Sequence, residues 1–344
     1  MDLRAHVKRA AAEALCRSGA DRLWAPAGGP RALVLGYHQV VEDEREAASS
    51  IPAMIITTSM LERQLDWVGR HFHFVSLDEL SRRLESGAAD GRPPAAVTFD
   101  DGYRDVYEHA FPLLQRKGIP AAVFVVTDLV GTARLMTHDR LYLLLTRIAA
   151  SRPPRDAVAA MRGLLESTPS AGLERLIQAH APALARAEEQ FPELQVLDWD
   201  MVRTLHRAGF TIGSHTSTHA LLTMETPDRV RQELSTSRRR LEDELGAPVR
   251  HFAYPDGRFD GAVVDAVAEA GYGFAYTTCR HRDRRHPLLT VPRRLLWENS
   301  CRDGAGRFSP SLMRGQVRGV FDLFGRCRHG HRAAAAARRQ PMTA

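Results

Sequence analysis

Two adjacent carboxylates that end an apolar segment are the first residues of this chain that could do chemistry. In "AAVTFDDGYRD" the apolar run 95–99 is followed by Asp100, Asp101 and Gly102. Adjacent side chains on a regular strand point to opposite faces, but Gly102 allows a sharp turn that aims both carboxylates into one cleft. Two carboxylates at close range repel each other unless a cation neutralises them. The pair therefore indicates either a metal site or a solvated Asp-Gly turn.

Two histidines four residues apart offer further metal ligands. The segment "GSHTSTH" follows another apolar run of strand character and contains His215 and His219. Two imidazoles and one carboxylate leave an open position for water, which is the pattern of a hydrolytic zinc site. Cobalt, nickel and manganese accept the same ligands. The spacing also arises by chance in a chain with 15 histidines, so the interpretation as a site depends on both motifs following strands of one sheet.

Short apolar runs alternate with helical segments along the chain. Strands are predicted at 32–38, 95–100, 121–126, 211–215, 251–255 and 274–278. Near-continuous apolar strands that alternate with helices predict a parallel sheet covered on both faces, either open or closed into a barrel. Catalytic groups of such a sheet lie at the carboxyl ends of the strands, which is where both motifs occur.

Helix starts and stops support this alternation. Ser59 with Glu62 and Ser76 with Glu79 fit capping boxes, in which each side chain accepts a hydrogen bond from the other residue's backbone N–H. Three glycines suit the left-handed position that follows a helix, namely Gly118, Gly209 and Gly271.

The chain divides into a central domain with less regular ends. A domain is predicted over 31–310, and its rhythm is interrupted by a helical insertion at about 132–197 that contains no strand pattern. The insertion is expected to cap the site. Residues 1–30 form an N-terminal amphipathic segment, and residues 311–344 form a basic tail that begins with a helix and ends in low-complexity sequence.

The basic tail accounts for the net charge of +6, because it holds seven Arg against one Asp. The near-neutral body argues against a nucleic-acid partner, and the basic ends favour a peripheral contact with an anionic membrane surface. The four cysteines show no CxxC pairing, so neither a thiolate zinc site nor a disulfide framework is expected. Neither a membrane span nor a secretory signal is evident. The predicted location is the cytoplasm or the inner membrane face.

Taken together, these segments resemble the polysaccharide deacetylases that share the NodB homology domain, carbohydrate esterase family 4. "TFDDGY" (98–103) is similar to the first motif of that family and "HTSTH" (215–219) to the second. "FAYPDG" (252–257) is similar to the third motif of the branch that deacetylates poly-N-acetylglucosamine. The resemblance covers roughly 31–296 and implies a distorted, incomplete (β/α) barrel.

The resemblance also implies a role for each matching residue. Asp100 would be the general base, and the backbone amide of Asp256 would donate to the oxyanion. The implied metal ligands are Asp101, His215 and His219, with Zn²⁺ as the expected ion.

The general acid does not come from the family's usual Leu-x-His motif, which this chain lacks. "LGYHQV" (35–40) resembles the N-terminal segment of the poly-N-acetylglucosamine branch, which implies that His38 is the acid. His is also the commonest proton-transfer residue at neutral pH. His281 and His286 are the alternatives, although their Arg-rich surroundings favour a solvated loop.

One position departs from the family pattern. Ala253 stands where the third motif usually carries an arginine that orients the base, and Arg293 or Arg294 is a candidate replacement. The implied function is a metal-dependent hydrolase that removes N-acetyl groups from an N-acetylhexosamine-containing polysaccharide or oligosaccharide. The alternative is a carbohydrate-binding protein of the same fold whose catalytic site is vestigial.

Overall fold

The structure is a computed structural model of the 344-residue chain. It describes residues 32–323 except 46, 48, 88–90, 149–153 and 155, and also 13–14 and 16–19. The expected amphipathic N-terminal segment and the low-complexity tail beyond residue 323 therefore lie largely or wholly outside the described residues. The described residues form two compact units: the first contains those within 1–123, 204–211 and 294–323, and the second contains those within 124–203 and 212–293.

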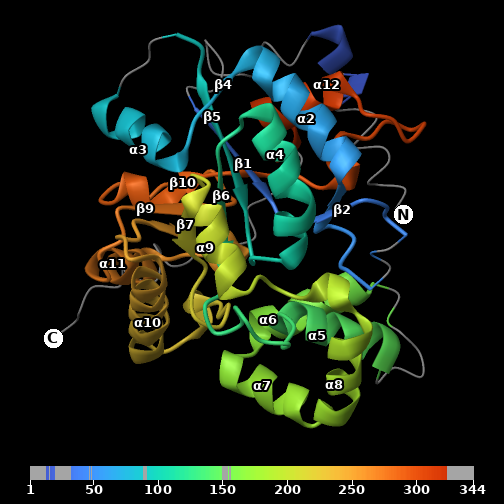
Figure 1. The fold of residues 1–344 in the computed structure, drawn as a ribbon, viewed down its shortest axis with the longest axis vertical. Coiled ribbons are helices and arrows are strands. Elements are labelled where there is room, and N and C mark those ends of the chain that lie inside the picture. Colours follow the sequence, from blue (N-terminus) through green and yellow to red (C-terminus); the bar gives the residue numbers. More distant parts are fainter. Residues whose placement is uncertain are drawn as a thin grey trace, which may run out of the picture. The chain divides into compact units, whose positions relative to one another are not determined.

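The first unit carries part of the main sheet, a separate two-stranded sheet formed by β2 (Gln39–Val41) and β3 (Ile55–Thr57), and covering helices (Figure 1). Its other strands are β1 (Leu33–Tyr37), β4 (His73–Phe74), β5 (Pro94–Phe99) and β11 (Arg294–Leu295). Its helices are α2 (Thr58–His71), α3 (Leu77–Ser86), α4 (Phe111–Lys117) and α12 (Pro310–Arg318), with a π-helical turn η2 (Val106–Ala110) before α4. Three elements contain boundaries between the two units in the sequence, namely β6 (Ala121–Val125), α9 (Trp199–Arg207) and β7 (Thr211–Ser214).

The second unit contains the rest of the sheet and the insertion. Its other strands are β8 (His251–Ala253), β9 (Phe274–Thr277) and β10 (Val291–Pro292), and its long helices are α10 (Pro227–Leu245) and α11 (Gly261–Glu269). The insertion consists of α5 (Thr137–Leu143), η3 (Leu144–Ile148), α6 (Ala157–Ser167), α7 (Ser170–Gln178), α8 (Ala181–Gln190) and η4 (Pro192–Leu194). Figure 1 shows α5 to α8 gathered into one group of helices.

The strands follow the order β10-β9-β8-β7-β6-β5-β1-β11, and β4 pairs with β5 outside this path. The pairings β10–β9, β9–β8, β8–β7, β6–β5, β5–β4, β5–β1 and β1–β11 are parallel, so the carboxyl ends of the strands in each of these pairs lie at the same edge. The incomplete (β/α) barrel predicted from the sequence is confirmed. All six predicted strands are present, whereas β2, β3, β4, β10 and β11 were missed because two or three residues show no readable alternation.

Most predicted helix ends are confirmed. Ser76 accepts a hydrogen bond from the N–H of Glu79 at the start of α3 (3.2 Å), and the three glycines that follow helices have φ of 62°, 89° and 83°. The prediction of Ser59 as a cap is wrong, because α2 is capped by Thr57, whose hydroxyl accepts from the N–H of Met60. Thr57 is fixed there by a distant carboxylate, since its N–H donates to Glu298 Oε2 (2.8 Å).

The insertion has a small core of its own. Leu135, Leu143, Ala187 and Leu194 are buried together, with Ile148 and Phe191 packed against them. No strand occurs among the insertion's described residues, as the sequence predicts. At the other end of the chain, α12 is the predicted tail helix, and it buries Leu312 and Met313 completely.

Candidate active site

The two adjacent carboxylates lie directly after β5, and both are buried, with 3% of Asp100 and 2% of Asp101 exposed. The register pairs Tyr37 of β1 with Phe99 of β5, and the N–H of Asp100 donates to the carbonyl of Tyr37 (2.9 Å). His38 follows Tyr37 as Asp100 follows Phe99. The proposed acid and the proposed base therefore leave neighbouring strands at the same edge of the sheet.

The backbone turns immediately after Asp100, which explains how a buried strand can end in two carboxylates. Asp101 and Gly102 both have φ of 69°, so the alternation of side chains between the two faces stops here. A left-handed conformation costs a non-glycine residue free energy, about 1 kcal/mol or more. The conformation that redirects the Asp101 side chain therefore lowers the stability of the fold. Because this side chain is also buried, a solvated turn does not explain it.

The histidine loop begins where β7 ends. The N–H of His215 donates to Val125 O of β6 (2.9 Å), and the chain then reverses, with φ of 70° at Thr216 and 63° at His219. The Thr216 hydroxyl accepts a hydrogen bond from the N–H of His219 (2.9 Å). This turn brings the two imidazoles back together, with ring centroids 4.9 Å apart.

A buried carboxylate of α10 holds this loop. Glu233 is fully buried, and its Oε2 accepts hydrogen bonds from the backbone N–H groups of Ser217 (2.8 Å) and Thr218 (2.9 Å). Its Oε1 accepts from the Thr218 hydroxyl (2.7 Å) and pairs with Arg229 (2.6 Å). The residues between the two histidines are therefore attached to a helix. Sequence reasoning missed Glu233, which stands among many charged residues in α10.

A second polar network connects β7 with α10 and Tyr272. The Ser214 hydroxyl donates to Ser237 Oγ (2.8 Å), which lies 3.3 Å from the hydroxyl of Tyr272. Tyr272 in turn donates to the backbone carbonyl of Leu234 (3.1 Å). Burial raises the pKa of Tyr272 to about 12, so its hydroxyl remains a hydrogen-bond donor to α10 even in moderately alkaline solution.

The orientation of His215 is set by a hydrogen bond at one ring nitrogen. Its Nδ1 lies 2.8 Å from the carbonyl of Ala253, and since a carbonyl only accepts, Nδ1 carries the proton and Nε2 keeps its lone pair. Metal-bound histidines are commonly oriented by such a bond from the other nitrogen. Ala253, which replaces the family's arginine, contributes to the site through its backbone.

The structure brings the three predicted metal ligands together. Asp101, His215 and His219 each offer a ligand atom, and these atoms lie within 4.8 Å of one another. One carboxylate and two imidazoles suit Zn²⁺ and similar divalent ions, and three protein ligands leave room for water or substrate. The donor set therefore fits the ion that the sequence motifs imply.

The third motif presents backbone rather than side chain. Asp256 lies in the 3₁₀ turn Pro255–Gly257 after β8 with φ of 53°. Thr277 fixes this turn, because its hydroxyl donates to the carbonyl of Gly257 (2.6 Å), and a Cβ at Gly257 would lie 2.6 Å from the backbone nitrogen of Thr278. The carboxylate of Asp256 is exposed and lies 3.9 Å from Arg258.

Left-handed backbone is concentrated in these motifs. Four non-glycine residues with positive φ occur in the part of the chain that the structure describes, namely Asp101, Thr216, His219 and Asp256. All four belong to the three motifs found in the sequence. Strained conformations persist where the surrounding structure enforces them, and they cluster at functional sites.

The two candidate replacement arginines differ in their contacts. Arg294 binds both carboxylate oxygens of Asp322 (2.8 and 2.7 Å), which engages its charge away from the motifs. Arg293 is 2% exposed, and its guanidinium lies 5.3 Å from the ring centroid of Phe124 in β6. A role for Arg293 in orienting Asp100 stays a prediction.

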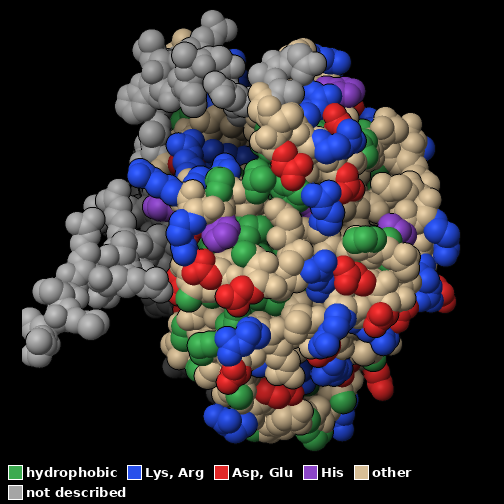
Figure 2. Space-filling view, turned by 90° about the vertical axis from the view of Figure 1, so that its left-hand side faces the viewer, with side chains coloured by type: hydrophobic (Ala, Val, Ile, Leu, Met, Phe, Trp, Pro, Cys, Tyr) green, Lys and Arg blue, Asp and Glu red, His purple; other side chains and the backbone are tan. Residues whose placement is uncertain are grey.

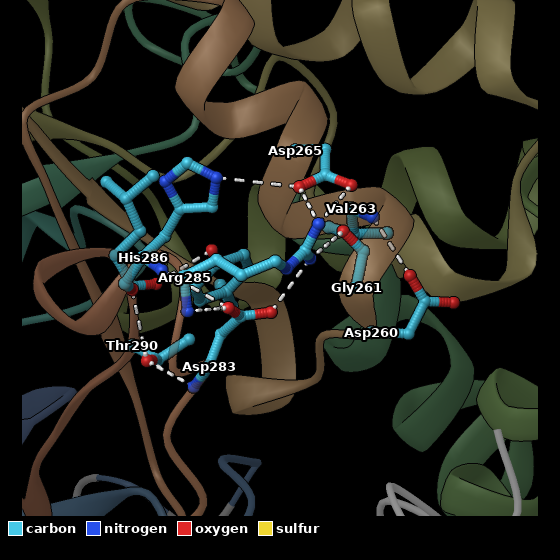
Figure 3. A network of polar contacts seen from close by, with 10 residues as sticks. Asp260, Gly261, Val263, Asp265, Asp283, Arg285, His286 and Thr290 are labelled. Carbon is cyan, nitrogen blue, oxygen red and sulfur yellow. Dashed lines mark hydrogen bonds and ion pairs between the residues drawn. The ribbon is translucent and has the colours of Figure 1, made fainter. Parts of the chain in front are cut away.

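The alternative acids, His281 and His286, lie in the Arg-rich loop that follows β9, and Figure 3 shows the surroundings of His286. His286 Nε2 lies 3.6 Å from Asp265 of α11. Arg285 pairs with the same carboxylate (2.9 Å) and also with Asp283 (3.0 Å), whose carboxylate caps the backbone N–H groups of Arg285 and His286. His286 thus belongs to a network that stabilises its own loop. The roles of His286, His281 and His38 in proton transfer are untested by these contacts.

The described surface offers little to an apolar partner. On the face shown in Figure 2, basic and acidic side chains are interspersed and hydrophobic ones are scattered. Leu176 is the one large hydrophobic side chain exposed among the residues described, at 39%. The helices described contain no stretch that is both long and apolar enough to span a bilayer.

Comparison with known proteins agrees with the motifs. The family model for polysaccharide deacetylases matches residues 87–275. A Bacillus subtilis protein, YxkH, whose name assigns it provisionally to the polysaccharide deacetylases, is 21% identical over 71% of this chain and 63% of its own length. The poly-β-1,6-N-acetyl-D-glucosamine N-deacetylase of Staphylococcus epidermidis is 28% identical over 29% of this chain and 38% of its own length. The chain thus spans less than two thirds of either relative.

A solved structure supports the fold. The Streptococcus pyogenes deacetylase PplD, determined in complex with acetate, superimposes with a TM-score of 0.56 at 19% identity. The match covers 83% of this chain and 97% of PplD.

Proposed function

Because the chain belongs to the polysaccharide deacetylase family, we propose that it is a metal-dependent hydrolase that removes N-acetyl groups from an N-acetylhexosamine-containing polysaccharide or oligosaccharide. One observation carries the proposal: ligand atoms of Asp101, His215 and His219 lie within 4.8 Å of one another. Asp100, the neighbour of the first ligand, is 3% exposed. A carboxylate beside a metal site is the arrangement that a hydrolytic general base requires.

A divalent ion held by these three residues, with Zn²⁺ the expected species, would supply a Lewis acid for the acetyl carbonyl oxygen and would lower the pKa of a water molecule. Asp100 accepts a proton from the attacking water, and the resulting hydroxide adds to the carbonyl carbon. The negative charge that develops on the carbonyl oxygen accepts a hydrogen bond from the backbone N–H of Asp256.

His38 completes the reaction as the general acid. An amide nitrogen is a poor leaving group until it is protonated, so His38 donates a proton to it as the C–N bond breaks. The products are acetate and a free amino sugar. The position of His38 directly after β1, the strand that pairs with β5, supports this role.

Release of acetate tests the proposal. The metal-free protein is loaded separately with Zn²⁺, Co²⁺, Ni²⁺ or Mn²⁺ and incubated with chitooligosaccharides or with oligomers of poly-β-1,6-N-acetylglucosamine. The second glycan is chosen because the staphylococcal relative is named for it. We expect acetate from at least one glycan and none after chelation. Glycan binding without acetate release by any of the loaded forms would instead favour a vestigial site.

A further inference from the structure

The insertion brings a buried third imidazole to the histidine loop. His138, the second residue of α5, is 5% exposed. Its ring centroid lies 5.1 Å from that of His219, with the ring planes at 70°. His219 makes an equivalent edge-on contact with His215, at 4.9 Å and 70°. The imidazole of His219 therefore contacts two other imidazoles.

His138 is held in place by the insertion itself. Its Nε2 lies 3.8 Å from a carboxylate oxygen of Asp139, which is 1% exposed. The next residue, Arg140, reaches Glu174 of α7 (3.7 Å) and Glu188 of α8 (3.9 Å). Burying three consecutive polar side chains in one helical turn costs free energy that an ordinary packing helix avoids. This cost suggests that the turn serves the site it contacts.

Ring contacts contribute to the orientation of His219. His215 is held by the hydrogen bond from its Nδ1 to Ala253 O, and the ring of His219 packs edge-on against the imidazoles of His138 and His215. His138 does not belong to the set of ligand atoms that lie within 4.8 Å of one another. Its contact is with a ligand rather than with the ion.

We propose that His138 is a positioning residue, whose ring fixes the plane of the His219 imidazole and thereby the direction of its metal-binding nitrogen. The helical insertion, on this view, contributes to metal affinity. The inference rests on the metal centre assigned under the proposed function. Residues that orient a metal ligand typically contribute about 10- to 100-fold to metal affinity.

The test measures Zn²⁺ binding by the metal-free full-length protein in competition with a chromophoric chelator. His138→Ala should weaken Zn²⁺ binding by about tenfold or more. His138→Phe retains an aromatic edge against His219 and should recover most of that loss. The visible absorption spectrum of the Co²⁺-loaded protein should change in His138→Ala, because it reports the geometry of the ligands.

Three controls separate this role from others. His180→Ala removes a half-buried histidine of the same insertion and should leave Zn²⁺ binding unchanged. Thermal unfolding of each metal-free variant shows whether a loss of affinity merely follows a loss of folding. His215→Ala should abolish binding.

The possible failures are distinguishable. If the wild-type protein binds neither Zn²⁺ nor Co²⁺, the metal centre itself is wrong, and the role of His138 falls with it. If the wild-type protein binds Zn²⁺ and His138→Ala binds it equally well with an unchanged Co²⁺ spectrum, only the role of His138 is refuted. Weaker binding by both His138→Ala and His138→Phe, in proportion to lost thermal stability, would also refute it.

Discussion

Removal of the Glu233 carboxylate should loosen the loop that carries both proposed histidine ligands. In Glu233→Ala the backbone N–H groups of Ser217 and Thr218 lose their acceptor, and each buried donor left without one costs about 1–3 kcal/mol. Breaking the ion pair with Arg229 adds to this, although the Arg229 side chain is 35% exposed and remains partly hydrated. We expect the free energy of unfolding to fall by about 3–5 kcal/mol.

Glu233→Gln should have a smaller effect. Its carbonyl oxygen can still accept from the two N–H groups, but its amide nitrogen faces the guanidinium of Arg229, so we expect a loss of about 1–2 kcal/mol. Asp228→Asn is the matched control on the same helix. Its side chain is 93% exposed and pairs with the exposed Arg231, so the expected loss is below about 1 kcal/mol.

Urea unfolding of the metal-free proteins measures these differences, and chelator competition measures the accompanying fall in Zn²⁺ affinity. In both the free energy of unfolding and the Zn²⁺ affinity, we expect the largest loss in Glu233→Ala, a smaller loss in Glu233→Gln and the smallest in Asp228→Asn. The reasoning would be refuted by a Glu233→Ala variant that loses less than about 1 kcal/mol and binds Zn²⁺ as the wild type does.

Three further predictions concern catalysis and pH. Asp100→Asn should retain bound metal and lose turnover, whereas His215→Ala should lose both, as determined by metal analysis and acetate release; normal turnover in Asp100→Asn would show that the base is wrongly assigned. His38→Ala should lose rate with its metal content unchanged, and a wild-type rate would redirect the search to His281 and His286. Burial raises the pKa of Tyr272 from its ordinary value of 10.0 to about 12, so between these values the unfolded chain loses this proton while the folded chain keeps it. The free energy of unfolding should therefore fall as pH rises through that range, by about 1.4 kcal/mol per pH unit from this group, and denaturation of Tyr272→Phe should show a shallower decline.

Local patterns predicted the parallel sheet, the strand-free helices between β6 and β7, and the three residues that offer the candidate metal ligands. The apolar strands and the glycines that follow helices depend on neighbouring residues, so they can be recognised in the sequence. The three motifs are equally local, and their positions after β5, β7 and β8 follow from the parallel order of the strands.

The features that were missed depend on distant partners. Glu233 contacts residues 15 or 16 positions earlier, and within α10 nothing distinguishes it from the other acidic residues. His138 appears in the sequence as part of an ordinary helix, and its contact with His219 depends on how the insertion folds back. The wrong cap at Ser59 has the same origin, because Glu298 fixes Thr57 from 241 residues away.

The left-handed turn at Asp256 affects how this site can be studied. The hydrogen-bond donor proposed there belongs to the main chain, so Asp256→Ala would keep the N–H, and a loss of activity in that variant would report strain in the turn rather than removal of the donor. What the turn demands is a residue that tolerates φ of 53°, such as Asn, Asp or Gly. Different residues at this position can therefore supply the same backbone N–H. A search based on side-chain identity would overlook this donor.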